Sequence, residues 1–216
     1  MKRFVARALI VVAAILGIVF AQVAPASATP THKLASTLVA SWTKVLQTPA
    51  DQSPYGSGGP ETGCVDLGGT LAPGWPFTFT GERSCTVKPG TKIFVTASSF
   101  ECSTLPNDDH PAGEPSFTDE QLLDCARALN LKKAPTAPTV TLDGRSVPIT
   151  AVETSAFEIV LPANNIFSAP AGTQGRSAAH GWVALLNPLT PGTHTIVISG
   201  DNITENTTTI TVEPGH

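Results

Sequence analysis

Short alternations of apolar and polar residues, each closed by a turn sequence, constrain this chain more than any other feature. Residues 157–161, 195–199 and 209–212 alternate in this way, and 18 glycines and 19 prolines supply breaks between such runs. Asp143-Gly144 separates two further runs as a two-residue hairpin sequence. Period-two alternation with frequent turns predicts short β-strands. We therefore predict a mainly β fold, a two-sheet antiparallel β-sandwich of immunoglobulin-like architecture.

One α-helix is predicted inside this β region, at residues 118–130. Thr118 and Gln121 form a capping box, and the acidic residues between them suit the positive N-terminal end of a helix. An apolar stripe gives the helix a face to bury: Leu122, Cys125, Ala126 and Leu129. The preceding residues 103–116 are rich in Pro and Asp, which predicts an exposed loop.

An N-terminal helical arm is predicted for residues 29–47. Ser36 is a candidate N-cap, and the apolar residues that follow recur at helical spacing: Leu38, Val39, Trp42 and Val45. Residues 48–63 are rich in Pro, Gly and Ser, which predicts a loop or linker. The sequence leaves open whether this arm packs on the β domain or reaches a partner.

The first 28 residues predict export. Three basic residues precede an apolar run at 8–19, and Ala26-Ser27-Ala28 supplies the small residues that a signal peptidase requires. The run is shorter than the roughly 18 to 20 residues that a membrane span needs. We therefore predict a signal peptide cleaved after Ala28, no transmembrane segment in the mature chain, and a secreted or extracellular protein.

The predicted organisation is a signal peptide at 1–28, an arm and linker at 29–63 and a β-sandwich domain at 64–216. The whole chain has thirteen basic and seventeen acidic residues, and three of the basic ones lie in the signal peptide. The mature chain thus keeps ten basic against seventeen acidic residues, a net charge of −7. Nucleic acid is not expected as a partner, because phosphate backbones select for Lys and Arg.

Four cysteines, Cys64, Cys85, Cys102 and Cys125, predict two disulfides in an exported chain. Three pairings are possible, and we favour Cys64–Cys85 with Cys102–Cys125. Each of these bonds closes a loop of about 20 residues, which is worth about 3 kcal/mol in the chain-entropy model. A four-cysteine metal site needs close pairs such as C-x-x-C, which these spacings lack.

The densest polar cluster is Asp108-Asp109-His110, with Glu101 and Glu114 nearby. Glu101, Asp108 and Asp109 are candidate metal ligands, because Ca²⁺ prefers oxygen ligands and a flexible loop. The histidine beside carboxylates is also a candidate general base. The spacing matches no known calcium loop, however, and prolines bracket the segment. A solvated loop without a cofactor is therefore favoured over a Ca²⁺ site or a catalytic site.

Two aromatic residues near Gly- and Pro-rich segments, Tyr55 and Trp75, are candidates for stacking on a sugar ring. The alternative for Trp75 is a place in the core with Phe77 and Phe79, which alternate with it. Aromatic residues make up 6% of the chain, so few rings are available for such a platform.

The segment from Gly175 to His180 partly resembles the nucleophile elbow of serine hydrolases. That elbow requires a strand, a sharp turn and a helix, with Gly two residues after the serine. Here Ala179 holds that position and a predicted strand follows. His180 and His194 are expected near strand starts, facing solvent or capping the sheet. No catalytic residue is predicted.

Four segments together resemble a group of uncharacterised secreted bacterial proteins. They read RSCTVKPGTKIF at 83–94, DG-x-x-VP at 143–148, LP-x-NNIF at 161–167 and PG-x-H-x-I at 191–196. The resemblance covers roughly residues 64 to 212 and implies a single β-sandwich domain behind a signal peptide. It implies no activity and carries no catalytic residue.

These observations favour a non-enzymatic binding or structural module at or beyond the bacterial cell envelope, with an envelope polymer or a protein as partner. One alternative is a secreted hydrolase that acts on envelope or extracellular polymer, with carboxylates from the region between Glu101 and Glu114. The other is a calcium-dependent adhesion module, whose melting temperature would rise with Ca²⁺. A fold of this kind hosts many functions, so the site must decide among them.

Overall fold

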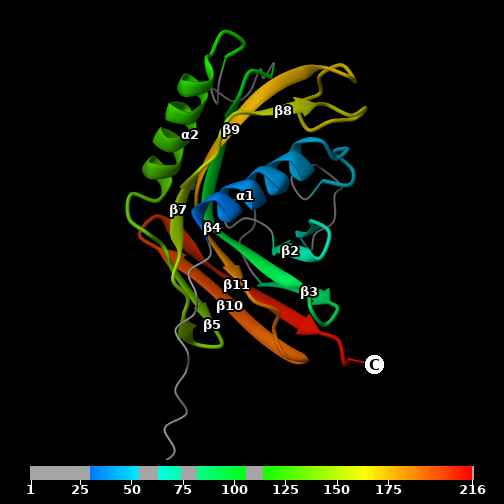
Figure 1. Cartoon of the computed structure of the whole chain (residues 1–216), viewed down its shortest axis with the longest axis vertical. Helices are drawn as coiled ribbons and strands as arrows, with labels where there is room; N and C mark the ends of the chain where they lie inside the picture. Colours follow the sequence, from blue (N-terminus) through cyan, green and yellow to red (C-terminus); the bar gives the residue numbers. More distant parts are fainter. Residues whose placement is uncertain (1–29, 54–62, 74–81, 106–113, 216) are drawn as a thin grey trace, which may run out of the picture.

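The computed structural model describes residues 30–53, 63–73, 82–105 and 114–215, and shows a mainly β protein with two helices and two sheets in that part of the chain. In chain order the elements are α1 (Thr31–Leu46), β1 (Cys64–Asp66), β2 (Thr70–Pro73), β3 (Glu82–Val87), β4 (Lys92–Ser103), α2 (Asp119–Lys133), β5 (Thr139–Leu142), β6 (Arg145–Ser146), β7 (Thr150–Glu153), β8 (Phe157–Val160), β9 (Gln174–Leu186), β10 (Gly192–Gly200) and β11 (Ile203–Val212). Figure 1 shows this arrangement, with the long strands β4 and β9 at its centre.

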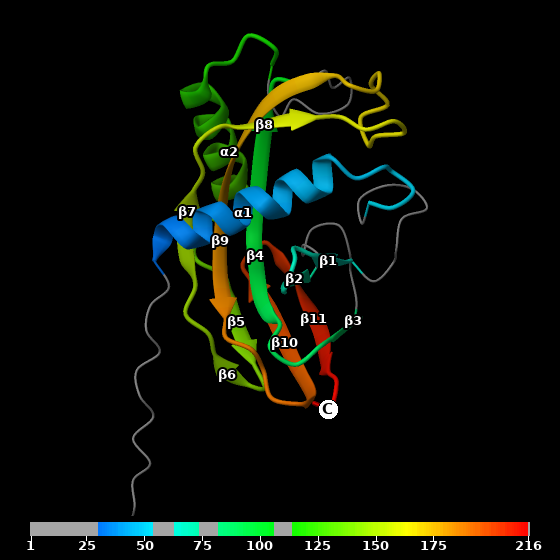
Figure 2. The same cartoon turned by 45° about the vertical axis from the view of Figure 1, so that its right-hand side comes forward.

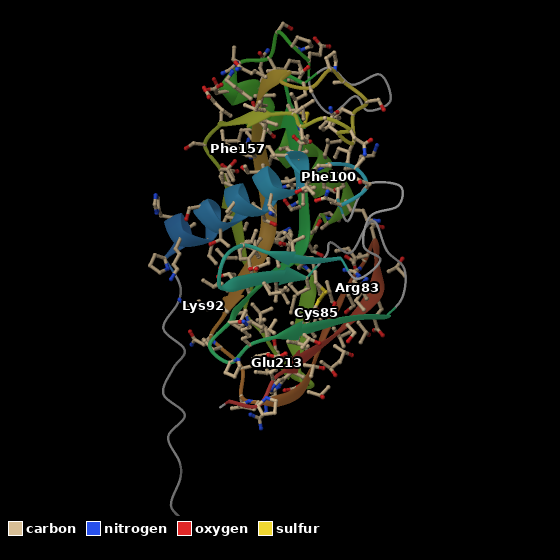
Figure 3. All side chains as sticks on the ribbon, turned by 90° about the vertical axis from the view of Figure 1, so that its right-hand side faces the viewer. Arg83, Cys85, Lys92, Phe100, Phe157 and Glu213 are labelled. Carbon is tan, nitrogen blue, oxygen red and sulfur yellow. A yellow bond between two sulfur atoms is a disulfide. The ribbon has the colours of Figure 1, made fainter. Side chains whose placement is uncertain are left out.

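The first sheet has the strand order β1-β2-β4-β9-β7, and β8 also pairs with β9. Its axis is the antiparallel pair β4 and β9, which runs from Ile93 opposite Leu186 to Ser103 opposite Ser177. Figure 3 shows Lys92 at the start of β4 and Phe100 farther up, near the level of Phe157 of β8. The second sheet has the order β3-β11-β10-β5-β6 and lies at the lower half of this axis (Figure 1).

Both sheets are mixed, which corrects the all-antiparallel prediction. Strand β2 pairs with β4 in parallel, and β3 pairs with β11 in parallel. The cause is the chain path, because after β2 the chain enters the second sheet as β3 and then returns to the first sheet as β4. Two strands of one sheet that are separated by such an excursion can run in the same direction. Hairpin sequences report the pairing of chain neighbours, so they could not reveal these partners.

Helix α1 covers one face of the first sheet, as Figure 2 shows. Its buried residues recur at helical spacing, and Leu34, Leu38 and Val45 join Phe94 of β4 in one hydrophobic cluster. The arm therefore packs on the β domain. The helix begins after Pro30 rather than at Ser36, whose hydroxyl instead donates to the carbonyl of Lys33. Pro30 holds the N-cap position, and its carbonyl accepts the first hydrogen bonds of the helix, from the backbone N–H groups of Lys33 and Leu34.

The opposite face of the first sheet is shared between the second sheet and helix α2. Ile93 and Val95 of β4 face the second sheet in a common core, whereas Cys102 faces α2. A register shift between Thr96 and Ser98 separates the two stretches. A bulge inserts an extra residue and so reverses which alternate side chains face a given side of the sheet. Odd-numbered residues of β4 therefore face the second sheet before the bulge, and even-numbered residues face α2 after it.

Helix α2 begins as its sequence predicts. The Thr118 side chain accepts a hydrogen bond from the backbone N–H of Gln121, and the Gln121 side chain accepts one from the backbone N–H of Thr118. Leu122 and Ala126 are fully buried against Cys102. The predicted hairpin is also present, since Asp143 and Gly144 both have positive φ, 51° and 75°, as a type I′ turn requires.

Candidate functional site

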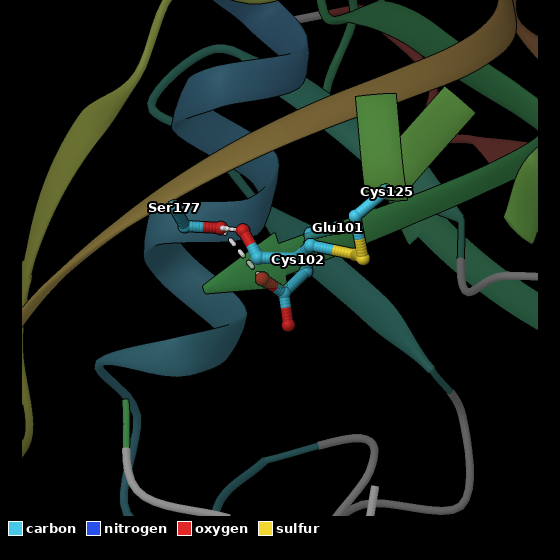
Figure 4. The surroundings of a disulfide bond; sticks show 4 residues. All are labelled: Glu101, Cys102, Cys125 and Ser177. Atoms are coloured by element: carbon cyan, nitrogen blue, oxygen red, sulfur yellow. Dashed lines mark hydrogen bonds between the residues drawn. A yellow bond between two sulfur atoms is a disulfide. The ribbon is translucent and has the colours of Figure 1, made fainter. Parts of the chain in front are cut away.

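The two disulfides have the favoured pairing, Cys64–Cys85 and Cys102–Cys125. The first joins β1 of the first sheet to β3 of the second. The second joins the upper end of β4 to α2 (Figure 4). One bond therefore ties the first sheet to the second sheet, and the other ties it to α2, the two layers that share one face of the first sheet. Both predicted bonds are confirmed.

Glu101 lies beside the second disulfide but points to the α1 side of the sheet. Its carboxylate accepts a hydrogen bond of 2.6 Å from the Ser177 hydroxyl, which is also 3.2 Å from the carbonyl of Cys102 (Figure 4). Burial raises the pKa of the Glu101 carboxyl to about 7, although the bond from Ser177 opposes the rise. Ser177 is fully buried within β9, so it is no exposed elbow nucleophile.

The other candidate residues of the sequence lie outside the described residues. These are the metal candidates Asp108 and Asp109, the candidate base His110 and the stacking candidates Tyr55 and Trp75. In the described ranges, no group of three or more His, Cys, Asp and Glu side chains is placed to hold a metal ion. Glu101 therefore has Ser177, rather than a second carboxylate, as its hydrogen-bonding partner there.

A shallow hollow of about 270 Å³ lies where β8 and β9 meet, lined by Thr104, Glu158, Ile159, Val160, Gln174, Gly175 and Arg176. Arg176 forms an ion pair with Asp119 and donates to the carbonyl of Phe117 at 3.1 Å. Its guanidinium thus ties the upper end of β9 to the start of α2. The ion pair with Asp119 thus occupies the guanidinium of Arg176, the positive group in this hollow that would otherwise attract an anionic ligand.

A buried polar network under α2 was not predicted from the sequence. The Asn130 side chain donates to Nδ1 of His180 at 2.8 Å and accepts from the Ser98 hydroxyl at 2.6 Å. His180 lies in the middle of β9 and is buried, which corrects the expectation of a histidine at a strand start. Burial lowers its pKa, so the ring is neutral and can accept from Asn130. The spacing of Leu122, Ala126 and Asn130 at four-residue intervals was the available clue that Asn130 faces the sheet.

His194 lies near the start of β10, as expected, and holds a turn. Its Nδ1 is 2.8 Å from the Asp143 carboxylate, and its Nε2 is 2.9 Å from the carbonyl of Thr190. The bond to Asp143 raises the pKa of His194 and lowers that of Asp143. Asp143 also accepts from the backbone N–H of Thr195, so this pair fixes the β5–β6 hairpin against β10.

The outward face of the second sheet carries hydroxyl groups on four neighbouring strands. Alternate residues point inward to the core, such as Ile196 and Ile210, so their neighbours point outward. We call these outward residues the hydroxyl face: Ser84 and Thr86 of β3, Thr207, Thr209 and Thr211 of β11, Thr193, Thr195 and Ser199 of β10, and Thr139 and Thr141 of β5. Val197 is the apolar member of these outward positions, and Glu82 holds the register position opposite Thr207.

Neither helix covers the hydroxyl face, whose residues are exposed or half-buried, and no hydrogen bond joins its hydroxyls to another described residue. Both helices make their packing contacts with strands of the first sheet, and Figures 1 and 2 show β10 and β11 away from them. Thr195 donates its backbone N–H to Asp143, whereas its hydroxyl and those of Thr207 and Thr209 have no hydrogen bond to another described residue. The face thus presents donors and acceptors that solvent or a ligand must satisfy.

Comparisons with protein-family models, with curated proteins and with solved structures found no match to this chain. Among the described residues, neither helix has the length and apolar character that crossing a membrane requires.

Proposed function

We propose that this protein is a secreted, disulfide-stabilised, non-enzymatic binding module that works at or beyond the bacterial cell envelope. The proposal includes the cleaved signal peptide, the reading of the two sheets as an immunoglobulin-like sandwich, and membership of the group of secreted bacterial proteins that the four segments resemble. The two disulfides support it, because such bonds persist in oxidising compartments outside the cytosol.

The observation that carries the proposal is the hydroxyl face. A sheet that packs one side on a core and leaves the other side open normally alternates apolar and polar residues. Here the open side has the same chemistry on four strands, and the two long ones, β10 and β11, contribute most of it. A broad, uniform surface of this kind suits recognition of an extended partner. The hydroxyl of Ser177, by contrast with those of the hydroxyl face, already donates a hydrogen bond to Glu101 within the protein.

Sedimentation with isolated cell envelopes tests the proposal. The mature chain with both disulfides formed is mixed with envelopes of the bacterium that produces it, and the bound fraction is measured against protein concentration. We expect saturable binding that is weakened by replacing Thr195 and Thr209 with valine. Absence of saturable binding to envelopes, and to the polymer fraction of the culture medium, would overturn the proposal.

A further inference from the structure

The hydroxyl face excludes several classes of partner by its composition. Anionic polymers and anionic lipid surfaces select for clusters of Lys and Arg, and neither residue occupies an outward register position of β3, β11, β10 or β5 in their described pairings. Stable protein interfaces centre on apolar and aromatic residues, whereas this face offers Val197 alone among its described outward positions. An uncharged partner that is rich in hydrogen-bonding groups matches this composition best.

The register arranges the hydroxyls in rows that cross the strands. Thr209 of β11 lies between Ser84 of β3 and Thr195 of β10, and a second row joins Thr86, Thr211 and Thr193. Neighbouring strands are about 4.8 Å apart, so the hydroxyls of one row repeat at roughly that interval. Each hydroxyl can both donate and accept a hydrogen bond. A chain of sugar rings presents similar groups at a regular interval along its length.

We propose that the hydroxyl face binds a neutral polysaccharide, which lies across β3, β11 and β10 along these rows. This inference rests on the proposed function, because it names the partner of the same surface. Affinity comes from many weak hydrogen bonds rather than from one pocket. Removing two central hydroxyls is therefore expected to weaken binding about tenfold.

Affinity electrophoresis in native gels provides the test. The mature protein is run in gels that contain a neutral polysaccharide, with dextran, yeast mannan and hydroxyethylcellulose as the three probes, and in gels that contain anionic alginate. We expect at least one neutral polymer to retard the protein and alginate to leave its mobility unchanged. Retardation by alginate alone, or by none of the three neutral polymers, would overturn the inference.

Matched variants assign the binding to the face. The double variant Thr195→Val and Thr209→Val keeps the β-branched shape but removes two hydroxyls, and is expected to lose most of the retardation. Thr195→Ser with Thr209→Ser keeps the hydroxyls and should retain it. Thr150→Val changes an exposed strand threonine of β7, outside the face, and serves as the control. Equal retardation of the valine variant and the control would show that another surface binds.

Two further measurements separate the possible failures. Circular dichroism and thermal melting establish whether the valine double variant is folded. If that variant is unfolded, Thr86→Val, at an exposed position of the edge strand β3, is used in its place. If the protein sediments with envelopes but no neutral polysaccharide retards it, the inference fails and the proposed function stands. If the protein binds neither envelopes nor the polymer fraction of the medium, and no neutral polysaccharide retards it, both fail.

Discussion

The first sheet of this protein is packed on both faces and the second on one face, and this difference explains where polar groups lie. The first sheet has α1 on one face and shares the other between α2 and the second sheet. Ser98 of β4 and His180 of β9 are buried polar residues of this sheet, and both have Asn130 of α2 as a hydrogen-bonding partner. The second sheet has one buried face and one open face. Its outward Thr and Ser residues need no internal partner because water reaches them, which leaves them available for a ligand.

The largest expected difference between the two sheets is in the cost of removing an apolar side chain. Phe94 is fully buried between the first sheet and α1, so Phe94→Ala should lower the free energy of unfolding by about 4 kcal/mol. Val197→Ala on the hydroxyl face should lower it by less than 1 kcal/mol. Urea unfolding of both variants measures this. Similar losses at both positions would mean that the hydroxyl face is covered in solution.

Removing the disulfide that holds α2 should have the next largest effect. The Cys102–Cys125 bond closes a loop with a sequence separation of 23, so replacing both cysteines with alanine should cost about 3 kcal/mol. Hydrogen exchange should increase first in α2, while β10 and β11 stay protected. A uniform increase in exchange across both sheets would contradict the view that this bond acts locally.

The stability of the first sheet should fall as pH rises because of Glu101. Its pKa is raised to about 7 in the folded protein, whereas its ordinary value is 4.5. The folded state therefore holds a proton that the unfolded state loses, and the stabilisation present below pH 4.5 is lost as pH rises to 7. We expect a loss of about 3 kcal/mol over this window, because the pKa differs by about 2.5 units between the two states. Glu101→Gln should remove this part of the pH dependence.

Unfolding measurements at pH 4.5, 6 and 8 test the role of Glu101, with Glu158→Gln as the control at an exposed strand position. His180 and His194 contribute pH dependence of their own, so the comparison is between each variant and the parent at the same pH. An unchanged slope in Glu101→Gln would show that the carboxyl is solvated in solution.

The smallest expected effects compare a buried polar group of α2, which packs on the first sheet, with a polar group on the hydroxyl face of the second sheet. Asn130→Ala leaves the Ser98 hydroxyl and Nδ1 of His180 without their partner and should cost about 2 kcal/mol. Thr209→Val should change stability by no more than about 0.5 kcal/mol, because the threonine hydroxyl faces outward. Thermal melting at pH 7.5 detects both. A large loss in Thr209→Val would assign the hydroxyl face a structural role instead.

Local features were predictable from neighbouring residues. The capping box of Thr118 and Gln121 and the turn at Asp143-Gly144 depend on backbone groups a few residues away, and both are present. The disulfide pairing followed because each bond joins cysteines that are near in sequence. The first half of β9, from Gln174 to His180, was missed because small residues there replace the large apolar residues that usually mark a strand.

The sequence by itself thus determined the β-rich class, the cap of α2 and the Asp143-Gly144 turn, since these arise from short-range geometry, and it favoured the disulfide pairing that the structure has. The tertiary structure decided which strands became neighbours, and so the parallel pairs β2 with β4 and β3 with β11. It also brought Glu101 to Ser177, placed His180 under α2 and gathered the hydroxyls of four strands on one open surface. These arrangements join residues far apart in the chain, and burial of the shared core, rather than any local pattern, selects them.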